Sequence, residues 1–213
     1  IVVKPKILAK SPQNLELSAA ATVPLAALTA YQALHHIAKI QSGQRVLING
    51  ASGGVGTFAT QLAKIAGAHV TTVTSHRNTE WMTTLGADTT LDYGTVDCCA
   101  GEARYDLFFD CYGNRSFPKA RRVLSPNGRY INTIPGPRTY GWTLGNPLRR
   151  QKSHVVVVRS RKKDLEEISG LIEDGALKPI VQAVYPMDDA QEAYRALETK
   201  RTRGKIALRI TPG

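Results

Sequence analysis

Short apolar runs alternate with stretches of helical periodicity through the middle of the chain. The runs are continuous, which is typical of strands that are buried on both faces of a parallel sheet. Six strands are predicted, at residues 45–49, 69–74, 89–93, 105–111, 129–134 and 154–158. Helices are predicted at residues 54–66, 78–85, 116–124 and 164–174, with Asn78 as the cap of the second. This order predicts an α/β fold, a doubly wound parallel sheet with helices on both faces.

The two ends of the chain depart from this alternation. Residues 18–34 are rich in alanine and helical in pattern, and they lead into the first strand. Residues 179–213 contain an apolar run, a helix and a last strand that do not extend the alternation. We therefore expect residues 1–38 to lead into the domain, 39–178 to form a nucleotide-binding domain, and 179–213 to return to another lobe. The chain starts with Ile1, so we expect the natural protein to start earlier.

A glycine-rich turn joins the first strand to the first helix of the domain. It fits the pattern G-x-G-x-x-G with Ala51 in the first glycine position and with Gly53 and Gly56 in the other two. Such a turn exposes backbone N–H groups at a helix N-terminus and lets a diphosphate approach closely. Its place between a strand and a helix predicts a dinucleotide site rather than a turn that serves only packing.

The second strand ends about 20 residues past the turn, where an acid binds the ribose 2′-hydroxyl of NAD. This sequence has Ser75, His76 and Arg77 there instead. A carboxylate would repel a 2′-phosphate, whereas a hydroxyl and a guanidinium bind one. Tyr93, at the end of the third strand, could reach the same phosphate. These residues predict NADPH rather than NADH as the cofactor.

The charge of the chain is uneven. The net charge is +11, and no acidic residue lies between Asp110 and Asp164. Two interpretations stay open: a solvated face beside an anionic cofactor, or docking of an acidic protein or anionic lipid onto residues 149–163. No nucleic-acid motif is present, so no nucleic-acid partner is expected. The basic residues of this stretch are Arg115, Lys119, Arg121, Arg122, Arg129, Arg138, Arg149, Arg150, Lys152, Arg159, Arg161, Lys162 and Lys163.

Cysteine and histidine usage offers little catalytic chemistry. Cys98, Cys99 and Cys111 form no C-x-x-C pair, so we expect reduced thiols and no metal site. That fits a cytoplasmic location, with an organelle as the alternative. The five histidines are scattered, and no general acid or nucleophile is assigned. No apolar run has the length of a membrane span.

Several segments together resemble one family. "AAATVPLAALTAYQAL", "GASGGVG", "LGADTTLDY", "RVLSPNGRYI" and "RGKIALRI" are similar to the medium-chain dehydrogenase/reductase superfamily, in its zinc-free quinone oxidoreductase branch. "TIPGPRTYGWT" resembles a subgroup of organellar and bacterial members. The resemblance implies a Rossmann domain with residual segments of a GroES-like catalytic lobe, and dimers are common in the family.

The resemblance also implies roles for particular residues. It places Thr29 at the nicotinamide, Ser75, Arg77 and Tyr93 at the adenosine phosphate, and Cys111 along the ribose. Residues 111–113 and 134–136, at two strand ends, should line the nicotinamide cleft. The residues implied at the diphosphate are Ser52, Gly53, Gly54, Val55 and Gly56.

Three functions follow from these expectations. The first is NADPH-dependent reduction of a small molecule, a quinone or an α,β-unsaturated carbonyl, by hydride transfer. The second is an enoyl-reductase domain of a fatty-acid or polyketide synthase. The third is an NADPH-binding module without turnover. Because most of the catalytic lobe is expected to lie outside this chain, the fragment is expected to be inactive alone.

Overall fold

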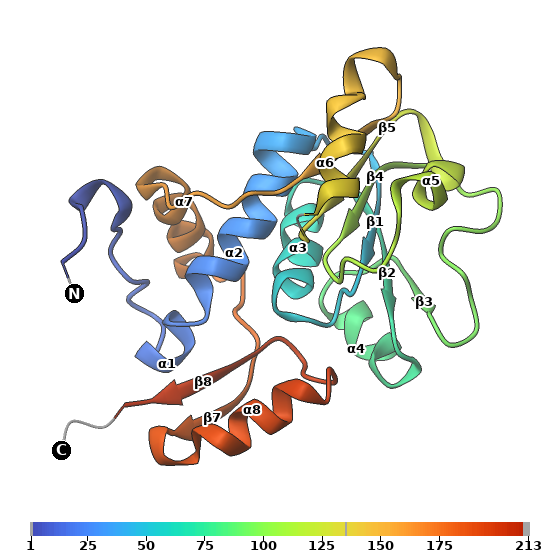
Figure 1. The fold of residues 1–213 in the computed structure, drawn as a ribbon. Helices are drawn as coiled ribbons and strands as arrows, with labels where there is room; N and C mark the ends of the chain where they lie inside the picture. The colour runs from blue at the N-terminus through green and yellow to red at the C-terminus, as the bar shows by residue number, and fades with distance from the viewer. Residues whose placement is uncertain (1, 135, 211–213) are drawn as a thin grey trace.

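The computed structural model describes residues 2–134 and 136–210, and its main feature is a parallel sheet (Figure 1). The order of the strands is β3-β2-β1-β4-β5-β6, and every neighbouring pair is parallel. The strands are β1 (Arg45–Asn49), β2 (His69–Thr74), β3 (Thr89–Asp92), β4 (Tyr105–Asp110), β5 (Leu124–Asn132) and β6 (Lys152–Val155). The predicted doubly wound α/β fold is confirmed, because this is the strand order of a Rossmann domain.

Helices cover both faces of the sheet. Figure 1 shows α2, α3 and α7 on one side and α5 on the other. The α-helices are α1 (Leu17–Ala20), α2 (Val23–Tyr31), α3 (Gly54–Ile65), α4 (Thr79–Thr84), α5 (Phe117–Ala120), α6 (Pro137–Leu144), α7 (Lys162–Glu173) and α8 (Ala190–Glu198). The π-helix η2 (Gln32–Ala38) extends α2, and the 3-10 turns are η1 (Pro5–Ile7), η3 (His76–Asn78), η4 (Arg121–Val123), η5 (Asn146–Leu148) and η6 (Met187–Asp189). Within the described residues, no helix has the length and apolar content that crossing a membrane would take.

The central strand shows why the predicted runs were continuous. Val46 and Ile48 of β1 belong to a core with α2, α3 and α7, whereas Leu47 belongs to a second core with Phe117 of α5. All three β1 side chains are fully buried. A strand that is covered on both faces has no solvent-facing position, and polar residues therefore do not alternate along it.

Some element boundaries differ from the prediction. The sixth strand of the sheet, expected at 154–158, is Lys152–Val155. It ends there because its partner β5 ends at Asn132 and the ladder stops. The helix expected at 116–124 is a short α-helix followed by a 3-10 turn. Helix α6 was not predicted. The side chain of Asn78 does not cap α4, since it donates to Thr74 and Ser75 and accepts from Arg203.

The C-terminal segment forms a small unit of its own. Its two strands, β7 (Val181–Pro186) and β8 (Lys205–Arg209), pair in parallel apart from the main sheet, and α8 packs on them (Figure 1). An isolated β-bridge joins Gly204 to Gly53, and the Gly204 N–H donates to the Ser52 carbonyl at 2.8 Å. Gly204 has φ +66° and lies against Ile180, so a side chain here would be strained and crowded. The segment is thus attached to the glycine-rich turn.

Candidate dinucleotide site

The sheet reverses its winding between β1 and β4. Strands β2 and β3 extend it on one side of β1, and β4, β5 and β6 extend it on the other. Loops at the carboxyl ends of two strands diverge at such a point and leave a crevice, which is where open α/β sheets bind ligands. A cavity of about 660 Å³ lies here, lined by Asn49, Gly50 and Ser52 after β1 and by Tyr112, Asn114 and Arg115 after β4. Its volume suits a small-molecule ligand or cofactor.

Backbone geometry shapes the glycine-rich turn for close approach. Gly50 has φ +74°, so the sharp turn is made there and not at Ala51, the residue expected in the first glycine position. Gly56 packs against the preceding strand end, and a Cβ on it would lie 2.5 Å from the Ala51 Cα. Both glycines are required for the N-terminus of α3 to sit tightly behind the strand. Gly53 is the N-cap, and Gly54 and Val55 begin the helix behind the cavity wall.

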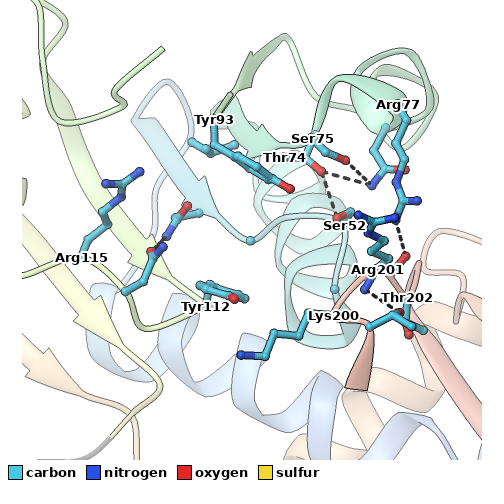
Figure 2. A pocket seen from close by; sticks show the side chains of 17 residues that line it. Ser52, Thr74, Ser75, Arg77, Tyr93, Tyr112, Arg115, Lys200, Arg201 and Thr202 are labelled. Carbon is cyan, nitrogen blue, oxygen red and sulfur yellow. Dashed lines mark hydrogen bonds between the residues drawn. The ribbon is translucent and has the colours of Figure 1, made fainter. Parts of the chain in front are cut away.

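A hydroxyl relay holds Ser52 at the cavity. The Asn78 amide donates to the Thr74 hydroxyl at 3.4 Å, and the Thr74 hydroxyl donates to the Ser52 Oγ at 2.9 Å. Because Ser52 Oγ accepts this bond, its own proton remains for a ligand. Figure 2 shows Ser52 between Thr74 and the turn that follows α8. A donor hydroxyl beside a helix N-terminus suits an anionic ligand.

The expected adenosine-phosphate residues meet at one end of the cavity. Ser75, Arg77 and Tyr93 all line it (Figure 2). Arg77 is exposed at the rim of the cavity, and one of its guanidinium nitrogens donates to the Arg201 carbonyl at 2.8 Å. A guanidinium has five N–H donors, so donors remain for a second partner. The side chain is therefore oriented and still able to bind an anion.

The opposite wall comes from a segment that sequence reasoning assigned to another lobe. Thr199, Lys200, Arg201 and Thr202, in the turn between α8 and β8, line the cavity. The four cationic residues around it are Arg77, Arg115, Lys200 and Arg201, and none of the described lining residues is acidic. The dense basic sequence "TKRTRGK" was the available signal. It could not be placed, because strand pairing between residues 53 and 204 is not visible in sequence.

Arg203 fastens the two walls together. Its Nε donates to the Asn78 side-chain oxygen at 2.7 Å, and its Nη2 donates to the Arg77 carbonyl at 2.8 Å. Its guanidinium also lies over the Trp81 ring, 5.2 Å from the centroid. The turn that carries Ser75 and Arg77 is thus tied to the α8–β8 turn.

A buried carboxylate organises the floor of the crevice. Asp110, at the end of β4, is fully buried and accepts from the Asn49 amide at 2.7 Å and from the Gly113 and Arg115 N–H groups at 2.8 Å. The Tyr130 hydroxyl lies 3.1 Å from the same carboxylate. Burial, followed by the Asp110 charge, raises the pKa of Tyr130 far above its usual range. Sequence reasoning did not identify this network, which aligns the loops after β1 and β4.

Five of the expected contact residues do not line the cavity: the helix residues Gly54, Val55 and Gly56, and also Thr29 and Cys111. Thr29 is buried within α2, and its hydroxyl donates to the Leu25 carbonyl at 2.7 Å. Cys111 packs against the core of the α2 and α3 face, and burial raises the pKa of its thiol well above the usual value. Neither residue joins Ser52, Ser75, Arg77 and Tyr93 in lining the space. Their roles toward the nicotinamide and the ribose stay predictions.

Three of the residues expected at the nicotinamide cleft line a second, smaller cavity, whereas Tyr112 lines the main one and Cys111 lines neither. The volume of the smaller cavity is about 230 Å³, and Gly113, Ile134 and Gly136 line it together with Trp142. Pro135, which the prediction also included, lies outside the described residues. Arg115 lines both cavities and thus lies between them.

A metal site is not supported by the donors of the described chain. The one described group of three potential ligands, Asp97, Cys98 and Cys99, is consecutive in sequence. The Arg115 guanidinium lies 3.7 Å from the Asp97 carboxylate, and its charge disfavours a cation there. These donors do not fit a zinc site. The Cys98 thiol has a lowered pKa, because it accepts a hydrogen bond from Cys99 and lies near Arg115.

The basic stretch 149–163 does not form one uniform face. Arg149 packs over the Trp142 ring, 5.0 Å from its centroid. Lys162 and Lys163 begin α7 and lie 3.6 Å and 3.9 Å from Glu166 and Glu167 one turn later. The two lysines at the end of the stretch are thus paired with acids, and docking of a partner there stays a prediction.

Comparison with known proteins identifies the family of the chain. A family model described as zinc-binding dehydrogenase matches residues 85–208. The chain is 34% identical to the chloroplast envelope quinone oxidoreductase homolog of Arabidopsis thaliana, covering 95% of this chain and 65% of the relative. It is 32% identical to a trans-enoyl reductase of Aspergillus terreus, covering 93% of this chain and 61% of the relative.

A solved structure shares the same fold. The quinone oxidoreductase from Coxiella burnetii superimposes with a TM-score of 0.86 at 27% identity, over 95% of this chain and 63% of that one. The chain thus spans slightly less than two thirds of the length of these relatives. The six-stranded sheet is the nicotinamide-dinucleotide-binding domain of these proteins, and the residues of the crevice fit such a cofactor. The chain belongs to the zinc-binding dehydrogenase family, in the quinone oxidoreductase branch of the medium-chain dehydrogenase/reductase superfamily.

Proposed function

We propose that the protein to which this chain belongs is an NADPH-dependent oxidoreductase that reduces quinones or α,β-unsaturated carbonyls. One observation carries the choice of cofactor: the crevice that would hold the adenosine end is lined by cations and by no described acid. Arg77 stands where an acid would bind the ribose of NADH. An arginine fork binds a phosphate, whereas a carboxylate repels one.

In this proposal, the described residues bind and orient the cofactor. The N-terminus of α3 and Ser52 bind the diphosphate, and Ser75, Arg77 and Tyr93 bind the 2′-phosphate. The cofactor supplies the hydride, which passes to an electron-poor carbon of the acceptor, and one proton from solvent or from a residue of the catalytic lobe completes the reduction. Asp110 holds the loops after β1 and β4 in register, so that the crevice keeps its shape without the ligand.

Turnover and cofactor choice are tested on the full-length protein. NADPH oxidation is followed at its absorbance maximum with a panel of quinones and enals, and NADH is compared at equal concentration. We expect turnover with NADPH and a clear preference for it. Arg77→Ala should weaken NADPH binding by roughly 1–3 kcal/mol and leave NADH binding nearly unchanged. Equal losses with both cofactors, or turnover with neither, would contradict the proposal.

A second enzymatic function has specific support. The similarity to a trans-enoyl reductase of Aspergillus terreus favours an acyl-chain enoyl reductase as the alternative. An enoyl thioester in the acceptor panel separates the two, because a quinone reductase would not prefer it. NADPH binding without turnover of any acceptor would instead indicate a binding module. A homodimer and a cytoplasmic or organellar location stay predictions.

A further inference from the structure

Two residues other than glycine have a positive φ in the described chain, and both are lysines at a helix end. Lys39 follows η2 with φ 53°, and Lys200 follows α8 with φ 54°. The Lys200 N–H donates to the Leu197 carbonyl at 3.0 Å, as the residue after a helix C-cap does. Glycine adopts this left-handed conformation freely, whereas a side chain adopts it at a cost. At either position, lysine therefore lowers the stability of the folded protein relative to glycine.

The surroundings of the two lysines differ. Both lysines are exposed, but Lys39 lines neither of the two described cavities. Lys200 lines the main cavity together with Ser52 and Gly53 of the glycine-rich turn. The strained conformation alone is therefore not a sign of function, but at Lys200 it directs an ammonium group into a cavity without described acids. An ammonium group binds phosphoryl oxygens as a mobile point charge.

The position of Lys200 also indicates which phosphate it would bind. Figure 2 shows its side chain extending into the cavity on the side of Tyr112, whereas Arg77, Ser75 and Tyr93 lie at the other end. Ser52 lies between these two groups. A dinucleotide that placed its 2′-phosphate at Arg77 would bring its diphosphate past Ser52 and toward Lys200.

We propose that Lys200 binds the diphosphate of the nicotinamide dinucleotide, and that this contact is what keeps a lysine in the conformation of glycine at the end of α8. The inference rests on the proposed function, because it requires that a dinucleotide binds. It adds a distinct prediction: the same residue lowers the stability of the free protein and raises the affinity for the ligand.

Replacement by glycine separates these two effects. Lys200→Gly should raise the melting temperature of the free protein by roughly 2–4 °C, since it relieves the strained backbone. The same variant should weaken NADPH and NADH binding equally, by roughly tenfold, as measured by fluorescence titration. Lys200→Gln should weaken binding to the same extent without the gain in melting temperature.

Lys39→Gly is the matched control, because it removes the same strain far from the cavity. It should raise the melting temperature and leave both affinities unchanged. Lys200→Gly that binds both cofactors like the wild type would overturn the inference, and so would a loss confined to NADPH, which would move the lysine to the 2′-phosphate. A wild-type protein that binds neither dinucleotide would overturn the proposed function itself, and the inference with it.

Discussion

Arg203→Lys tests whether the two walls of the crevice are held together by one guanidinium. Arg203 donates to the Asn78 side chain at 2.7 Å and to the Arg77 carbonyl at 2.8 Å, and it stacks on Trp81. A lysine can keep one of these hydrogen bonds but loses the fork and the stacking. We count about 1 kcal/mol for one hydrogen bond of an exposed side chain and about 0.5–1 kcal/mol for the cation–π contact.

The expected cost in stability is therefore about 2 kcal/mol, or roughly 4–8 °C in melting temperature for a chain of this size. Calorimetry measures it, with Arg195→Lys on the exposed face of α8 as a matched control that should change nothing. Because Arg203 positions the turn that carries Arg77, NADPH affinity should fall several-fold more than NADH affinity. A melting temperature within about 1 °C of the wild type, or equal losses for both cofactors, would refute the reasoning.

Three further predictions follow from the same structure. Gly56→Ala should lower the free energy of unfolding by about 1–3 kcal/mol and weaken the binding of NADPH and NADH equally, because its Cβ would press on the Gly50 and Ala51 backbone. Thermal unfolding and cofactor titration measure these two effects. Asp110→Asn should lower the free energy of unfolding by about 2–4 kcal/mol, measured in urea, because the new amide NH₂ would face N–H groups that now donate to the carboxylate. A decrease below about 1 kcal/mol would contradict the role given to the network. Burial lowers the pKa of His154, as do Arg129 and Lys152, so the unfolded chain binds more protons just below about pH 6.5 and stability should fall there as pH decreases. His154→Gln should flatten that decrease between pH 7.5 and 5.5 in urea unfolding, and an unchanged slope would contradict the assignment.

The alternation of strands and helices could be predicted because it depends on local patterns. Continuous apolar runs such as Val46–Ile48 indicate burial on both faces, and the glycine-rich turn indicates a strand followed by a helix. Boundaries were less predictable where tertiary pairing decides them. Strand β6 ends early because β5 does, and Asn78 bonds to Arg203, more than a hundred residues away, rather than to its own helix.

The candidate site was predictable in part for the same reason. Ser52, Gly53, Ser75, Arg77 and Tyr93 follow strands of one sheet, and parallel strands bring their carboxyl ends together. Lys200 and Arg201 follow a helix in a separate unit, and only the pairing of Gly204 with Gly53 brings them to the crevice. Thr29 and Cys111 were placed by resemblance, and neither lines the cavity: Thr29 is buried within α2, and Cys111 is partly buried against the core.

The lining of the crevice comes from two segments that are far apart in the chain, and the hydrogen bond from the Gly204 N–H to the Ser52 carbonyl joins them. A protein engineered from the six-stranded sheet alone would keep Arg77 and Arg115 but would lack Lys200 and Arg201, which are half of the cationic residues that line the crevice. Any minimal nucleotide-binding unit cut from this protein must therefore include residues 199–205 as well as the sheet at 45–155.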